Sequence, residues 1–149
     1  MIFFQKKVLG RFSCLGYFTL MFYVVFLSND RWNKNLLFDE RLHVIPFYSK
    51  IKYLSTDHSL IELCTFYIDI IGNILMFIPL PFYVFFILGR TNFRNVIVIA
   101  FLTSFLIEFI QFSFHLGVAD IDDLLLNTLG AIIGLTTIKL IKKHYTAPR

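Results

Sequence analysis

The sequence predicts an all-α integral membrane protein, a bundle of four transmembrane helices with an interfacial segment in the outer loop between the first two. Hydrophobic residues make up 57% of the 149 residues and charged residues only 16%, whereas average soluble domains carry about 25% charge. Four apolar runs each have close to the roughly 20 residues that a helix needs to cross hydrocarbon. The runs are continuous rather than alternating, which excludes a transmembrane β-barrel, and 19 Phe and 7 Tyr exclude intrinsic disorder.

The whole chain, residues 1–149, is expected to form one membrane domain. Its spans are predicted at about residues 12–28, 66–88, 96–115 and 123–141, with an outer loop at 29–65. The first run is longer than the apolar core of a usual signal peptide and no small-residue cleavage site follows it, so we expect an uncleaved signal-anchor helix. Pro79 and Pro81 are expected to kink the second span. Pro46 interrupts any single helix through the outer loop, which predicts a short helix or hairpin on the outer membrane surface.

The positions of Lys and Arg predict the orientation of a multi-pass protein of the cell membrane with both termini in the cytoplasm. Nine of the fourteen lie at the two ends of the chain and in the second loop: Lys6, Lys7, Arg11, Arg90, Arg94, Lys139, Lys142, Lys143 and Arg149. The loop between the third and fourth spans carries no Lys or Arg, as expected for a loop outside the cell. The loop between the first two spans carries five, which disagrees with its predicted place outside. The net charge of +4 is therefore mainly a topology signal, and no nucleic-acid partner is expected because no basic face with stacking aromatics is present.

Polar residues recur at helical spacing on three of the predicted spans. They are Asp69 and Asn73 on the second, Ser104, Glu108, Gln111 and His115 on the third, and Asp120, Asp123, Asn127, Gly130 and Gly134 at the fourth. At 1.5 Å per residue, Asn73 and Glu108 lie about 10 Å from the outer ends of their helices and Asn127 about 8 Å. Because these depths agree, we expect one polar pocket in the outer half of the membrane, open to the outside.

Each of these polar residues also has a purely structural explanation. Asn73 and Asn127 fit interhelical hydrogen bonds that only hold helices together, worth about 0.6 kcal/mol on average. Glu108 favours a functional site, because a charged side chain in the membrane is costly. The acidic run of Asp120, Asp122 and Asp123 is also explained by a solvated loop in which Asp120 caps the fourth helix and Asp123 occupies its first turn. Gly130 and Gly134 form a GxxxG motif that lets helices approach closely, within one chain or between two, and His115 fits an interfacial position.

Four segments, in this order, resemble the VanZ-like membrane protein family: RLHVIPF at 41–47, NILMFIP at 73–79, EFIQ at 108–111 and DIDDLLLNTLG at 120–130. The resemblance covers the chain from about residue 36 to its end. Many relatives carry an Arg between the last two motifs, where this chain has none; if that Arg holds a ligand anion in relatives, this chain either uses another cation, such as Arg41, or has lost the role. The family is named for a protein that raises resistance to the glycopeptide teicoplanin, so the resemblance implies a role in the cell envelope but no defined reaction.

These observations leave three hypotheses. In the first, the protein is not catalytic, is surrounded by membrane lipids, and binds an envelope ligand, either a lipid-linked cell-wall precursor or the glycopeptide. The binding residues are Asn73, Gln111, Asp120, Asn127, Arg41 and His43. In the second, an intramembrane enzyme acts on an envelope lipid, with Glu108 as general acid or base and Asp123 as a second carboxylate. No cofactor is predicted for the first; in the second, a divalent cation would be held by Asp120, Asp123 and Asn127. The third is a scaffold whose polar contacts are structural. The sequence leaves catalysis and the oligomeric state open.

Overall fold

The computed structural model describes residues 2–27, 42–89 and 92–146 and is all-α, as predicted. In chain order its elements are α1 (Ile2–Phe22), the π-helical turn η1 (Tyr23–Leu27), β1 (Leu42–His43), α2 (Tyr48–Leu54), α3 (Leu60–Phe77), α4 (Leu80–Leu88), α5 (Phe93–Ser113), β2 (Ala119–Asp120) and α6 (Ile121–Thr146). Four stretches are long and apolar enough to cross a membrane: Val8–Leu27, Leu60–Leu88, Phe93–Ser113 and Ile121–His144. The predicted four-span membrane bundle is therefore confirmed.

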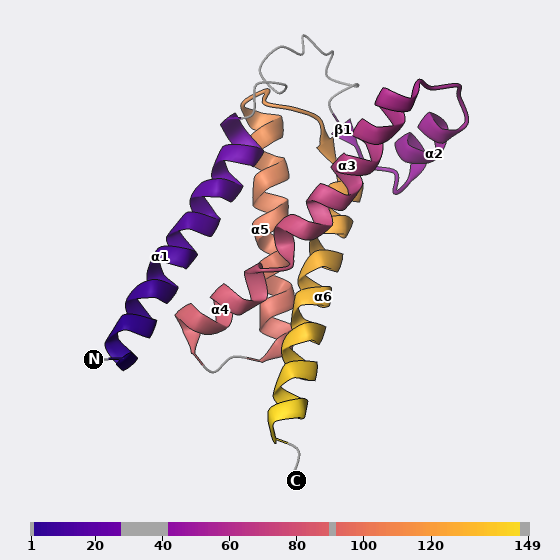
Figure 1. Ribbon diagram of the computed structural model, residues 1–149. Helices are drawn as coiled ribbons and strands as arrows, with labels where there is room; N and C mark the ends of the chain where they lie inside the picture. The colour runs from indigo at the N-terminus through magenta and orange to yellow at the C-terminus, as the bar shows by residue number, and fades with distance from the viewer. Residues whose placement is uncertain (1, 28–41, 90–91, 147–149) are drawn as a thin grey trace.

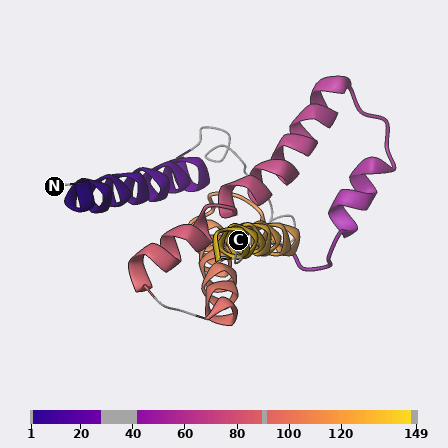
Figure 2. The ribbon, with the colours of Figure 1, turned by 60° about the horizontal axis from the view of Figure 1, so that its bottom comes forward.

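The centre of the bundle is α6, which packs against both α3 and α5 (Figure 1). The helix α1 stands to one side, and its N-terminal end leans away from the other spans (Figures 1 and 2). The start of α1 and the end of α6 lie on the same side of the bundle, opposite to β1 and α2 (Figure 1). We call the side with β1, β2 and α2 the strand end, and the other the terminal end.

The two glycines of the GxxxG motif face α3 and α4 within the same chain. A Cβ atom added to Gly130 would overlap the backbone carbonyl oxygen of Ile74. A Cβ on Gly134 would overlap that of Ile78 and press on the ring of Pro81. Both glycines are buried, so the close approach of α6 to α3 and α4 depends on the absence of side chains here.

The second span differs from its prediction at its start and in its middle. It begins at Leu60 rather than near residue 66, because Ser59 and Glu62 form a capping box that starts the helix earlier. The pattern Ser-x-x-Glu before an apolar run was readable in the sequence. Near its middle the span does not merely kink but breaks into α3 and α4 at Ile78–Pro79, since Pro79 and Pro81 have no N–H to donate to the preceding turn.

A side chain from α1 satisfies a carbonyl at this break. The Tyr17 hydroxyl donates a hydrogen bond of 2.8 Å to the Met76 carbonyl oxygen. The Tyr17 ring also stacks on Tyr83 of α4 at a centroid distance of 4.8 Å, and the Tyr83 hydroxyl lies 2.7 Å from Ser13 Oγ. Through these contacts α1 is attached to the two halves of the broken span.

The loop between the first two spans contains a short helix, one of its two expected forms, and no hairpin within the part that the structure describes. Instead, β1 pairs in parallel with β2, so that Leu42 lies opposite Ala119 and His43 opposite Asp120. The partner strand of β1 comes from the connection between α5 and α6, and the hairpin alternative for residues 28–41 lies outside the described residues. Arg41, predicted to supply a positive charge, lies outside the described residues.

Candidate functional site

A cavity of about 440 Å³ lies between α1 with η1, α3, α5 and α6. Most of its lining is apolar, and its polar lining comes mainly from three spans: Asp69 and Asn73 on α3, Glu108 and Gln111 on α5, and Asp123 and Asn127 on α6. All six belong to the polar stripes identified in the sequence. The fourth wall, which includes Met21 and Val25, comes from the first span. The sequence did not predict this, because the first span has no stripe of polar residues.

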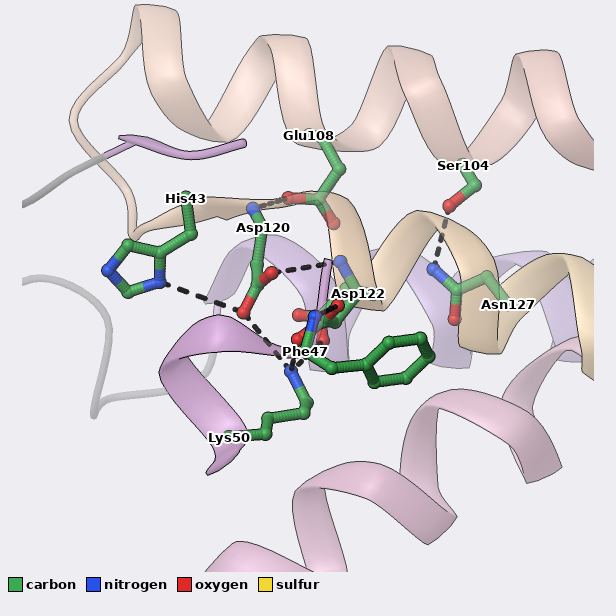
Figure 3. A network of polar contacts seen from close by, with 9 residues as sticks. His43, Phe47, Lys50, Ser104, Glu108, Asp120, Asp122 and Asn127 are labelled. Carbon is green, nitrogen blue, oxygen red and sulfur yellow. Dashed lines mark hydrogen bonds and ion pairs between the residues drawn. The ribbon is translucent and has the colours of Figure 1, made fainter. Parts of the chain in front are cut away.

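Asn127 lies in the interior of the bundle and has one polar atom without a partner. Its side chain is 1% exposed, and its Nδ2 donates a hydrogen bond of 2.9 Å to Ser104 Oγ on α5. Its Oδ1 is fully buried, points away from Ser104 and accepts no hydrogen bond from the protein (Figure 3). A buried acceptor left unmatched costs about 1–3 kcal/mol, so this atom has unused capacity to accept a hydrogen bond.

Glu108 and Gln111 join α5 to backbone groups of other segments. Glu108 is buried, and its Oε2 accepts a hydrogen bond of 3.0 Å from the backbone N–H of Asp120 (Figure 3). The Gln111 Nε2 donates a hydrogen bond of 3.1 Å to the carbonyl oxygen of Val25 in η1. The last carbonyls of a helix lack partners within it, so Gln111 satisfies the end of the first span.

Beside the cavity, at the strand end, Lys50 of α2 lies among three carboxylates, which we call the aspartate cluster: Asp120, Asp122 and Asp123. Its Nζ is 3.1 Å from Asp120 Oδ2, 3.2 Å from Asp122 Oδ2 and 3.6 Å from Asp123 Oδ1 (Figure 3). Burial lowers the pKa of Lys50, but the three carboxylates together raise it more, so its pKa lies above the ordinary value. Lys50 is therefore charged across the physiological range.

Asp122 makes the most enclosed contact of the cluster. Its side chain is 0% exposed, and its Oδ1 accepts a hydrogen bond of 2.7 Å from the backbone N–H of Phe47. Its own N–H donates to Asp120 Oδ1 at 2.8 Å, so Asp120 caps the N-terminus of α6 as expected. The interpretation of Asp122 as part of a solvated loop is wrong, because α2 covers it.

The predicted residues thus divide between the cavity and its surroundings. Asn73, Glu108, Gln111, Asp123 and Asn127 line the cavity, whereas Asp120 lies outside that lining. His43 also lies outside it, with Nδ1 3.7 Å from Asp120 Oδ2. His115, after the end of α5, is exposed.

The cation that reaches the cluster in this structure is Lys50, which sequence reasoning missed. No local pattern distinguishes it from Lys52, its exposed neighbour on the same helix.

The divalent-cation hypothesis named Asp120, Asp123 and Asn127 as ligands. Across residues 2–27, 42–89 and 92–146, no three His, Cys, Asp or Glu side chains are grouped so that they could hold a metal ion. The ammonium of Lys50 lies where these aspartates converge. The hypothesis of a bound divalent cation stays a prediction.

Comparisons with known proteins agree with the resemblance found in the sequence. A family model described as VanZ/LLP1 matches residues 14–142. Protein VanZ of Enterococcus faecium is 33% identical over 81 residues, which cover 51% of this chain and 47% of that protein. The chain therefore spans about half the length of this curated relative. No solved structure matches the chain significantly.

Proposed function

The chain belongs to the VanZ/LLP1 family, and we propose that it is a non-catalytic membrane protein of the cell envelope that binds an amphiphilic envelope ligand. The observation that supports this is the cavity of about 440 Å³ lined by polar residues from three spans. Its volume lies within the roughly 300–1,000 Å³ of typical ligand sites. Its mainly apolar lining suits a hydrocarbon chain, and its polar side suits a head group.

The proposal includes an orientation and a consequence. With both termini in the cytoplasm, the strand end faces outward, and the cavity is open to ligands of the outer leaflet. A lipid-linked cell-wall precursor or the glycopeptide itself would then bind there, and occupation would change the susceptibility of the cell to antibiotics of the teicoplanin type.

A pair of glycine substitutions tests whether the cavity carries the function. Gly72 lines the cavity, and a Cβ atom there would meet no atom within 4 Å. Gly72→Trp should therefore fill the cavity without disturbing helix packing. Gly16→Trp is the matched control, because Gly16 has equally open surroundings and lies outside the lining.

The measurement is the inhibitory concentration of teicoplanin for a susceptible host that expresses each variant at equal membrane levels. We expect the wild type and Gly16→Trp to change it alike, and Gly72→Trp to leave it at the value of the empty host. Equal effects of all three proteins would contradict a ligand-binding cavity.

An intramembrane enzyme is the second candidate, favoured by the presence of two carboxylates, Glu108 and Asp123, in one cavity. In the same assay, Glu108→Gln keeps an oxygen that accepts the N–H of Asp120 but removes the titrating group. An unchanged effect with normal expression would contradict the enzyme. Loss of the effect together with loss of folded protein would favour the scaffold hypothesis.

A further inference from the structure

We infer that the cavity receives its ligand sideways from the membrane, through a mouth between the first span and α3, and that this ligand is a lipid of the leaflet at the strand end. The head group lies inside the cavity, and the hydrocarbon chain stays in the bilayer. The inference rests on the proposed function, which it deepens by naming the ligand class and its route. It differs from the expectation of a pocket that opens to the aqueous outside.

The mouth is located by the lining residues that are exposed. Among the described lining residues, the exposed ones all belong to the first span or to α3: Leu20, Val24, Ile68, Asp69, Gly72 and Leu75. The lining residues that come from α5 and α6 are buried or half-buried. The cavity therefore opens between the first span and α3.

The other three seams between neighbouring helices are closed by specific contacts. Gln111 of α5 donates a hydrogen bond to the backbone of η1, and Asn127 of α6 donates one to Ser104 of α5. Where α6 meets α3, Gly130 lies so close to the Ile74 carbonyl that a Cβ atom would overlap it. Among the described segments, these contacts leave the seam between the first span and α3 as the way in.

The break in the second span accounts for this opening. Because the two prolines near its middle end α3 and start α4 in another direction, α4 approaches the first span while α3 turns away from it (Figures 1 and 2). In α4, the Tyr83 ring stacks on Tyr17, and a Cβ atom on Gly10 would meet the Phe86 ring at 2.7 Å. The seam is thus closed toward the terminal end and open toward the strand end.

The mouth lies at membrane depth rather than at the membrane surface. Both of its edges belong to stretches that are long and apolar enough to cross a membrane. At 1.5 Å per residue, Leu20 lies about 10 Å from the end of the first span at Leu27, and Ile68 about 12 Å from the start of α3 at Leu60. Exposed residues at this depth contact lipid chains, so a molecule that enters between them comes from the bilayer.

The aqueous side of the cavity, at the strand end, is covered by α2 and β2. The Nζ of Lys50 in α2 lies 3.6 Å from Oδ1 of Asp123, which lines the cavity. The backbone N–H of Asp120 in β2 donates a hydrogen bond to Glu108, which also lines the cavity (Figure 3). A ligand that arrived from water would have to displace these segments, whereas a lipid that arrives from the side leaves them in place.

The lining changes from mainly apolar at the mouth to polar in the depth. Leu20 and Leu75 are 62% and 58% exposed at the mouth. Asn127, on the far wall, is 1% exposed, and its Oδ1 has no hydrogen-bond partner in the protein. An amphiphile whose head group points inward matches this order, because its polar atoms reach buried polar groups and its chain stays among lipids.

Labelling of single thiols tests the route, after Cys14 and Cys64 have been replaced by Ser. The full-length protein is held in phosphatidylcholine nanodiscs. Ile107→Cys places a thiol in the cavity lining. Leu102→Cys reports exposure to lipid, and Asp57→Cys reports exposure to water, since both positions are exposed and lie outside the lining.

Three methanethiosulfonates are compared, and each forms a disulfide with the thiolate and releases methanesulfinate. One carries an octadecyl chain and partitions into the bilayer; the others carry a trimethylammonium or a sulfonate group and stay in water. Taking the ratio of rates at one thiol cancels the reactivity of that thiol. We expect the ratio of octadecyl to water-soluble labelling at Ile107→Cys to match that at Leu102→Cys. It should exceed the ratio at Asp57→Cys at least about tenfold, equivalent to about 1.4 kcal/mol in the barrier.

A bulky side chain in the mouth should block the route. Gly72→Trp should slow octadecyl labelling of Ile107→Cys at least about tenfold and leave labelling of Leu102→Cys unchanged. Ile68→Trp, also in the mouth, gives the same test if Gly72→Trp fails to fold. Gly16→Trp is the control, because Gly16 lies outside the lining and has open surroundings.

A ratio at Ile107→Cys as low as that at Asp57→Cys would overturn the inference, because the cavity would then open to water. Octadecyl labelling that neither tryptophan in the mouth slows would also overturn it, as would the absence of any labelling of Ile107→Cys. The proposed function fails separately. If the octadecyl reagent enters through the mouth but Gly72→Trp leaves the susceptibility assay unchanged, the route stands and the proposed function is wrong.

Discussion

The two ends of the bundle are held together by different kinds of interaction. At the strand end, segments about 70 residues apart in sequence meet through ion pairs and hydrogen bonds, as Lys50 and Phe47 do with the aspartate cluster. Toward the terminal end, the core is apolar, with Phe77, Val96 and Ala100 fully buried, and the fit between α6 and the broken span depends on shape. A bundle in lipid gains little from apolar burial between its helices. Close packing therefore stabilises the terminal end, and specific polar pairs hold the segments of the strand end in place.

The largest effect is expected where shape alone determines the packing. Gly130→Ala places a methyl group on the carbonyl oxygen of Ile74, and we expect a loss of about 3 kcal/mol of stability, at the upper end for overpacking. The measurement is the free energy of unfolding in mixed micelles titrated with SDS. Gly72→Ala is the control, because its added methyl meets no atom within 4 Å, and it should change stability by less than about 0.5 kcal/mol. Equal losses would mean that contact with α3 does not set the cost.

A smaller effect is expected at the strand end. Lys50→Met removes the ammonium that three carboxylates share, which costs about 2 kcal/mol, less than the 3–5 kcal/mol of fully buried pairs because 17% of the Lys50 side chain is exposed. Lys52→Met, on the same helix, should be almost neutral because Lys52 is exposed. The readout is protease cleavage within α2, which should accelerate in Lys50→Met alone.

The same pair has a defined pH dependence. The pKa of Lys50 is raised in the folded protein above its ordinary value of 10.5, so its contribution is fully present below pH 10.5 and is lost as the pH rises through the folded-state pKa. The difference between wild type and Lys50→Met should therefore stay constant from pH 7 to 9. A difference that declines within this range would contradict the raised pKa.

The smallest effect is expected inside the membrane. Ser104→Ala removes the hydroxyl that accepts from Asn127 and should cost about 0.6–1 kcal/mol, the range of interhelical hydrogen bonds in membranes. Thr137→Val is the control, since the Thr137 hydroxyl is exposed and bonds only within α6, to the carbonyl of Ile133. The SDS titration used for the glycine variants measures both, and a loss above about 2 kcal/mol for Ser104→Ala would show that Asn127 anchors more than one contact.

Sequence reasoning reached the features that repeat along one helix. The polar stripes that contain Asn73, Glu108 and Asn127 were visible because spacings of three and four place residues on one face, and these faces line one cavity in the structure. The positions of the spans followed from hydropathy, whereas the start at Leu60 follows from the capping box of Ser59 and Glu62, a sequence pattern that hydropathy does not register.

What the sequence did not reveal depends on pairing between distant segments. Lys50 looks like any lysine of a loop until β1 pairs with β2 and brings α2 onto the start of α6. Asp122 likewise appears solvated until α2 covers it. Such contacts leave no periodic trace in one sequence, because each partner lies about 70 residues from the other.

This separation also orders the biogenesis of the molecule. Lys50 emerges from the ribosome before its aspartate partners, and at about 5–20 residues per second the 70 residues between Lys50 and Asp120 take about 4–14 s to synthesise. During that time the first two spans can insert, but α2 has nothing to dock on. Docking of α2 therefore marks a chain whose synthesis has reached the start of α6, and a protease that cuts exposed α2 would distinguish molecules in which this contact has formed from those in which it has not.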